Sequence, residues 1–238
     1  MANPWFAFKL FTVYHNQCAM KVGTDGVLLG AWIITSGVQT LLDVGTGSGL
    51  IALMCAQRSE AFIEAVEIDE KAFNQAVDNC RNSPWNNRIQ VFHGPFQQFA
   101  RLSEKKYDLI VSNPPYFRNS LKPQTSARMR ARHDVHLNYE SLIYWSATLL
   151  SPKGRLGVIV PFDDATHFTE LAYLSGLYPL RLTKVIPHAG KTYTRCLAEY
   201  SKRMDVSCIT DELVIKREDR NEYTDDFKSL TGDFYLNL

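Results

Sequence analysis

The chain has 238 residues, and its 26 Lys and Arg against 25 Asp and Glu give a formal net charge of +1. This balance excludes a protein that binds nucleic acids or membranes through its overall charge, so any such partner requires a local patch. With 45% hydrophobic and 21% charged residues, the chain is an ordinary globular protein with one large domain or two small ones.

The cysteines are odd in number and widely spaced, and no Cys-x-x-Cys pair occurs: Cys18, Cys55, Cys80, Cys196 and Cys208. This pattern disfavours a disulfide framework and a zinc site and favours a reducing cytoplasm. His133-x-x-His136 lacks a third ligand in the sequence, so we predict no metal site. No apolar run is long enough to span a bilayer, and Met1 to Tyr14 does not resemble a secretion signal.

Aromatic and β-branched residues dominate residues 5–14 and predict a strand or hairpin arm. Two glycines, at positions 23 and 26, then break the chain, and a helix follows in which Thr24 or Asp25 is expected to be the cap. Two alternatives are open for this segment. In the first, Lys21 is a solvated charge and Asp25 a helix cap. In the second, the segment folds over a ligand as a lid, with Lys21 and Thr24 as candidate ligand-binding residues.

A short apolar strand at residues 40–44 contains Asp43 and leads into a loop with three glycines, Gly45, Gly47 and Gly49. A helical pattern follows the loop. Glycines let the backbone approach a ligand closely, and the free N–H groups at a helix start attract negative charge, so a nucleotide-type site is predicted. A dinucleotide fingerprint needs a glycine at position 50, where Leu50 stands, and no P-loop Lys follows.

The next predicted strand, residues 61–66, ends in Glu67-Ile68-Asp69, about 20 residues beyond the glycine loop, where the ribose-binding acid of such folds stands. We predict that Glu67 binds the ribose and that Asp69 caps the following helix. Later strands are expected at 88–92, 107–112, 154–160, 180–186 and 192–200. Helices at 139–150 and 165–174 lie between them, and the charged run from Asp211 to Asp226 is expected to be surface.

Alternating strands and helices predict an α/β fold: a mostly parallel seven-stranded sheet with helices on both faces. With no linker or repeat, we expect a single domain, in which residues 1–37 are an N-terminal strand/helix extension and residues 38–238 the core.

Asn113-Pro114-Pro115-Tyr116 interrupts the fourth strand of this core. Two prolines fix the backbone dihedral φ and remove two N–H donors, so the strand ends stiffly with free carbonyl acceptors. That end suits a ring-shaped substrate that donates hydrogen bonds. The alternative is a Pro-rich turn without a function, which the glycine loop and Glu67 upstream make less favourable.

A basic segment follows Tyr116, with Phe117 at its start and five cations: Arg118, Lys122, Arg128, Arg130 and Arg132. No acid lies between Arg118 and Arg132, and the segment adjoins the candidate site. It is predicted to contact the phosphates of a nucleic acid, and a solvated loop with incidental charge is the alternative.

The strand, glycine loop and acid together resemble the class I S-adenosylmethionine-dependent methyltransferases, which have a Rossmann-like fold. Asn-Pro-Pro-Tyr is similar to the motif of the subgroup that methylates exocyclic or amide nitrogens. Met20 to Trp32 resembles the N-terminal signature of the bacterial enzymes that methylate N6 of adenine 37 in a valine tRNA, and the likeness extends over most of the chain, including Ser83-Pro84-Trp85. That family usually has an acid after the third strand to receive the adenine amine of the cofactor, where this chain has Pro95.

The resemblance implies S-adenosylmethionine as cofactor and the anticodon stem-loop of a tRNA as partner, with a monomer that needs no obligate protein partner. The implied cofactor-binding residues are Lys21, Thr24, Asp43, Gly45, Gly47, Gly49, Glu67 and Asn113. The implied catalytic residues are Asn113, Pro114 and Tyr116. Phe117 and the five cations of the basic segment would bind the RNA. With Pro95 in place of the acid, the adenine would rest on apolar packing and backbone acceptors, helped by Phe96 or Gln97.

The chemistry of amine methylation explains the motif. The exocyclic nitrogen of adenine is a poor nucleophile because its lone pair is delocalised, so the enzyme must orient and polarise it. The Asn113 side-chain oxygen and the Pro114 carbonyl can each accept one N–H, and Tyr116 can stack on the base. A guanine in RNA, an adenine in DNA or a protein glutamine are alternative targets. A silent cofactor- or RNA-binding module is another alternative, and Leu50 disfavours a nicotinamide oxidoreductase.

Overall fold

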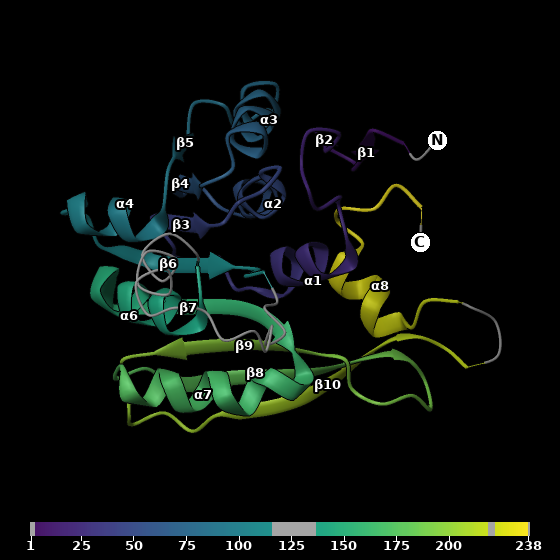
Figure 1. The fold of residues 1–238 in the computed structure, drawn as a ribbon. Helices are drawn as coiled ribbons and strands as arrows, with labels where there is room; N and C mark the ends of the chain where they lie inside the picture. The colour runs from purple at the N-terminus through teal and green to yellow at the C-terminus, as the bar shows by residue number, and fades with distance from the viewer. Residues whose placement is uncertain (1–2, 116–136, 219–221, 238) are drawn as a thin grey trace, which may run out of the picture.

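The computed structural model describes residues 3–115, 137–218 and 222–237, which form an α/β structure around one large sheet (Figure 1). The sheet has eight strands in the order β10-β8-β9-β7-β6-β3-β4-β5. Among these described strands, β9 alone runs antiparallel to its neighbours. The strands are β3 (Thr40–Val44), β4 (Phe62–Glu67), β5 (Ile89–His93), β6 (Tyr107–Ser112), β7 (Leu150–Pro161), β8 (Tyr178–His188), β9 (Arg195–Ser201) and β10 (Ile209–Lys216).

The fold class is confirmed, but the expected count of seven strands is wrong. The eighth strand is β10, in the charged run expected to be surface, and it pairs in parallel with β8 from Ile209 to Lys216. It is an edge strand, and its first residues are exposed, Asp211 and Glu212 among them. Charged side chains are common on edge strands, where they oppose pairing with other chains, so the charge conceals the strand pattern in the sequence.

Helices cover both faces of the sheet, as expected. One face carries α1 (Thr24–Trp32), α2 (Leu50–Arg58), α3 (Glu70–Arg81) and α8 (Asp225–Thr231), and the other carries α4 (Phe96–Leu102), α6 (Tyr139–Leu149) and α7 (Ala165–Leu174). A short 3-10 helix, η1 (Phe162–Asp164), follows β7. None of the helices in the described ranges combines the length and the apolar character that a membrane span needs.

The predicted N-terminal hairpin is present as β1 (Trp5–Ala7) and β2 (Thr12–Tyr14), which form a separate two-stranded sheet. It packs on the C-terminal end of the chain, where the Lys9 N–H donates to the Phe234 carbonyl at 2.8 Å, and Figure 1 shows the two ends near each other. Helix α1 begins after Gly23 without a side-chain cap, so the predicted cap by Thr24 or Asp25 is wrong. Both residues already lie within the first turn.

Candidate active site

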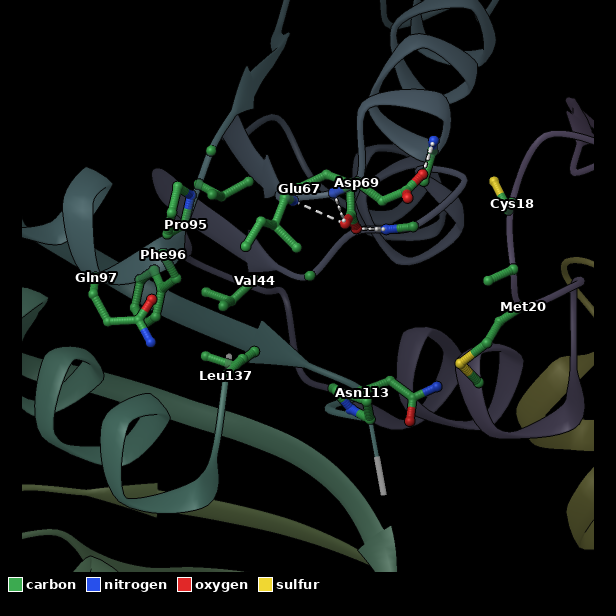
Figure 2. A pocket seen from close by; sticks show the side chains of 18 residues that line it. Cys18, Met20, Val44, Glu67, Asp69, Pro95, Phe96, Gln97, Asn113 and Leu137 are labelled. Carbon is green, nitrogen blue, oxygen red and sulfur yellow. Dashed lines mark hydrogen bonds between the residues drawn. The ribbon is translucent and has the colours of Figure 1, made fainter. Parts of the chain in front are cut away.

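A cavity of about 250 Å³ opens at the carboxyl ends of the neighbouring parallel strands β3, β4 and β6 (Figure 2). Loops that follow adjacent parallel strands meet at one edge of the sheet, which is where ligands bind in doubly wound folds. Most of the lining comes from the glycine loop, the end of β4, residues 94–97 and the end of β6. The edge therefore gathers the two segments that the sequence singles out, around positions 45 and 113.

The glycines of the loop have two different roles. Gly45 and Gly47 line the cavity with φ of 71° and 58°, a left-handed conformation that favours glycine. A Cβ at Gly47 would meet no atom within 4 Å, so the space beside it is open to a ligand. Gly49 does not line the cavity; a Cβ there would lie 3.3 Å from the Cys80 sulfur. Its small size lets α2 pack closely on α3.

Asp43 lies beneath the glycine loop and not in the cavity wall. It is completely buried, and its Oδ2 accepts hydrogen bonds from the Thr46 hydroxyl at 2.6 Å and the Ala52 N–H at 3.1 Å. Its Oδ1 has no hydrogen-bond partner among the described residues. Burial raises the pKa of the Asp43 carboxyl to about 7, with a smaller contribution from the Glu67 charge. The structure therefore shows Asp43 holding the glycine loop from beneath, and a contribution of Asp43 to cofactor binding would act through the loop.

The raised pKa predicts how stability depends on pH. Folded Asp43 binds its proton more tightly than unfolded Asp43, so its contribution is greatest below pH 3.8 and is lost as the pH rises through about 7. Asp43→Asn should reduce the fall in unfolding free energy between pH 5 and pH 8 by roughly 2–4 kcal/mol. Urea denaturation at both pH values measures this. The control is Asp78→Asn, because Asp78 is exposed. If Asp43→Asn loses as much unfolding free energy between pH 5 and pH 8 as the wild type does, the assignment is wrong.

Glu67 ends β4 with a carboxylate whose orientation is fixed by the backbone. Oε2 accepts the Gly47 N–H at 2.8 Å, and Oε1 accepts the N–H groups of Ile68 and Asp69 at 2.8 and 2.9 Å. Since a carboxylate offers about four acceptor positions, one on Oε2 is left for a ligand hydroxyl. Asp69 caps α3 instead, accepting the Ala72 N–H at 2.9 Å. The predicted cap by Asp69 is confirmed, and the ribose contact of Glu67 stays a prediction.

Pro95 and its neighbours form the opposite end of the cavity from Met20 and Asn113 (Figure 2). Pro95 is the N-cap residue of α4 and makes no side-chain cap bond. Phe96 and Gln97 are each only 4% exposed and line the same end, so an aromatic ring and a buried amide stand beside the position of the missing acid.

Asn113 follows β6 directly and lines the cavity with Pro115, whereas Pro114 is buried and does not. The Ser112 hydroxyl donates to the Val44 carbonyl at 2.8 Å, which ties the end of β6 to the end of β3. The hydrogen bond fixes Asn113 relative to the glycine loop. Tyr116 and the predicted RNA-binding residues Phe117, Arg118, Lys122, Arg128, Arg130 and Arg132 lie outside the described residues, as does His133-x-x-His136.

The N-terminal extension reaches the cavity, as the lid alternative expects, but through residues other than the predicted ligand-binding ones. Lys21 and Thr24 are exposed and do not line it, whereas Cys18, Ala19 and Met20 do. Met20 begins the N-terminal signature, whereas Cys18 and Ala19 precede it without any periodic pattern, so nothing in the sequence marks those two as lining residues. Leu137, beyond the basic segment, also lines the cavity without having been predicted.

The comparisons with known proteins identify the chain as a methyltransferase. Residues 26–161 match the family model described as the methyltransferase small domain. Over 239 residues, covering all of both chains, the sequence is 45% identical to the tRNA1(Val) (adenine(37)-N6)-methyltransferase of Bacteroides fragilis (strain YCH46). It is 43% identical over 235 residues to the enzyme of the same name from Histophilus somni, covering 98% of each chain. The chain belongs to the tRNA1(Val) (adenine(37)-N6)-methyltransferase family.

Solved structures support the fold at lower sequence identity. A predicted O-methyltransferase from Agrobacterium tumefaciens has a TM-score of 0.68 at 18% identity, covering 90% of this chain and all of the other. A putative RNA methyltransferase from Pyrococcus horikoshii has a TM-score of 0.53 at 14% identity, covering 75% and 82%. Both show that the Rossmann-like methyltransferase architecture is shared.

Proposed function

We propose that this methyltransferase transfers a methyl group from S-adenosylmethionine to N6 of adenine 37 in the anticodon loop of a valine tRNA. The observation that supports it is that Glu67 and Asn113 open on one cavity, in a chain whose relatives carry that activity in their names. We expect the protein to act in the cytoplasm as a monomer, without an obligate protein partner.

The residues of the cavity fit the cofactor. Glu67 has an acceptor position for a ribose hydroxyl, and the open space beside Gly47 admits the ligand close to the backbone. The adenine would lie between Pro95, Phe96 and Gln97, on apolar packing rather than on a carboxylate. When bound, the cofactor supplies an electrophilic sulfonium methyl.

The chain itself would orient the amine. The Asn113 side-chain oxygen would accept one N–H of the adenine amino group. The backbone carbonyl of Pro114, whose ring is buried and does not line the cavity, would accept the other, so that the nitrogen lone pair points toward the methyl. Tyr116 would stack on the base, for about 1–3 kcal/mol, comparable to the cost of extruding it. The basic segment, from Arg118 to Arg132, would contact the phosphates of the anticodon stem.

Nucleoside mass spectrometry of tRNA from cells that lack this protein tests the substrate. We expect N6-methyladenosine to disappear from the valine tRNA and to return when the wild-type chain is restored, but not the Asn113→Ala variant. Normal N6-methyladenosine would contradict the proposal and favour a guanine in RNA, an adenine in DNA or a protein glutamine. Absent binding of S-adenosylmethionine would favour a silent module.

A further inference from the structure

Residues 15–23, named the strap here, run along one side of the cavity between β2 and α1. The strap has no helix or strand, yet Cys18, Ala19 and Met20 line the cavity. Figure 2 shows Cys18 and Met20 across the cavity from Pro95 and Gln97. A segment without regular structure keeps such a position only where contacts at its ends hold it.

The first end of the strap is held by a buried amide. Asn79 on α3 is 2% exposed, and its Oδ1 accepts the Tyr14 N–H at 3.0 Å. Its Nδ2 donates at 2.8 Å to the Tyr14 carbonyl and at 2.8 Å to the Ser48 carbonyl. Tyr14 immediately precedes the strap and Ser48 belongs to the glycine loop. One side chain therefore joins the strap to the loop that lines the cavity.

The second end is held by an ion pair. Asp25 in the first turn of α1 accepts from the Arg195 Nε at 2.8 Å, and the two side chains are only 22% and 30% exposed. Arg195 begins β9 opposite Pro161, the last residue of β7, which runs parallel to β6. The pair therefore ties the end of the strap to the sheet edge that carries Asn113.

A histidine closes the strap between these anchors. His15 is 6% exposed, its Nδ1 accepts the Val22 N–H at 3.4 Å, and its Nε2 lies 3.0 Å from the Asn3 carbonyl. The first and last parts of the strap are thereby joined, so that it behaves as one loop between two fixed points.

We infer that Asn79 and the Asp25–Arg195 pair are positioning residues that hold the strap over the cofactor and determine how tightly it is retained. The inference rests on the proposed use of S-adenosylmethionine. Since apparent affinity falls with the fraction of molecules in the binding-competent state, a loosened strap weakens cofactor binding. Neither anchor lines the cavity, so methyl transfer at saturating cofactor should change little.

The Asp25→Asn variant provides the main test. We expect the dissociation constant of S-adenosylmethionine, measured by calorimetry, to rise about two- to fivefold, the change that corresponds to loss of one such ion pair. The kcat at saturating cofactor should stay within about twofold, and Asp25→Glu should restore affinity. Asn79→Ala removes three buried hydrogen bonds and should raise the dissociation constant by more than about tenfold.

Limited trypsin digestion gives a second readout, because exposed Lys21 lies within the strap. Cleavage after Lys21, followed by mass spectrometry, should be faster in Asp25→Asn than in the wild type. The control is Asp225→Asn, which breaks a more exposed Asp–Arg pair, between the first turn of α8 and Arg217, that involves no residue of the strap or of its anchors. It should change neither cofactor affinity nor cleavage.

Unchanged affinity and unchanged cleavage in Asp25→Asn would overturn the inference, as would a fall in kcat with an unchanged dissociation constant. If the wild type does not bind S-adenosylmethionine, the proposed cofactor is wrong. The cleavage rates of the ligand-free proteins then still decide whether Asp25 holds the strap.

Discussion

Replacing Asn113 by Ala should lower the rate of methyl transfer to a tRNA transcript by about 10²–10³-fold, the usual cost of removing one polarising group from a reaction centre. Asn113 stands at the end of β6 on the cavity, and the Ser112 hydrogen bond to Val44 that fixes the strand end does not involve its side chain. The affinity for S-adenosylmethionine should therefore change by less than about threefold. Transfer of a labelled methyl group and calorimetry measure the two quantities separately.

Asn87→Ala is a matched control, since Asn87 is exposed and precedes β5 at the other edge of the sheet. It should leave both quantities unchanged. Parallel loss of methyl transfer and cofactor binding in Asn113→Ala would mean that Asn113 mainly holds the cofactor, and the assigned role as acceptor for the amine would be wrong.

The second large effect is expected at Glu67, where Glu67→Gln should weaken S-adenosylmethionine binding about 100-fold. Both carboxylate oxygens accept backbone N–H groups, so an amide must turn its NH₂ toward a donor and lose at least one charged hydrogen bond, worth about 1.5–3 kcal/mol. The contact with the ribose would be weakened as well. Titration calorimetry at several cofactor concentrations measures the change.

Two comparisons separate the ribose contact from the shape of the loop. The wild type should bind S-adenosylhomocysteine more tightly than an analogue that lacks the ribose hydroxyls. This difference in affinity should be smaller in Glu67→Gln. Glu64→Gln is the matched control, because Glu64 lies on the same strand, is also 8% exposed, and binds Tyr107 and Lys105 away from the cavity. An equal loss for both cofactor analogues would restrict Glu67 to shaping the glycine loop.

The predicted strands of the core and the glycine loop come from local patterns. The apolar run before Gly45, the glycine spacing and the acid at the end of the next strand are encoded within about 25 residues, and the hydrogen bonds that realise them are equally local. Parallel strands then place the ends of β3, β4 and β6 together, since their carboxyl ends share one edge. Asn113 and Glu67 could therefore be expected at one site before any tertiary contact was known.

Local patterns were insufficient where charge hid the alternation of a strand or where burial decided the role of a residue. The acidic residues of β10 concealed an edge strand, because such strands need little apolar character on their exposed side. Asp43 and Gly49 belong to the predicted cofactor motif by spacing, yet the structure shows Asp43 supporting the loop and Gly49 allowing close helix packing. A motif identifies which residues act together, whereas burial decides which of them face the ligand.

The sequence by itself determined the fold class, the glycine loop with Glu67, and Asn113 at the end of a strand, because each depends on residues close together in the chain. For the segment after the N-terminal hairpin, the sequence left a lid and a solvated cap open as alternatives, and tertiary structure alone decided which of its residues line the cavity and what anchors them. These anchors join Tyr14 to Asn79 across 65 positions and Asp25 to Arg195 across 170. Contacts over such separations depend on how the elements pack, and no spacing within one segment encodes them.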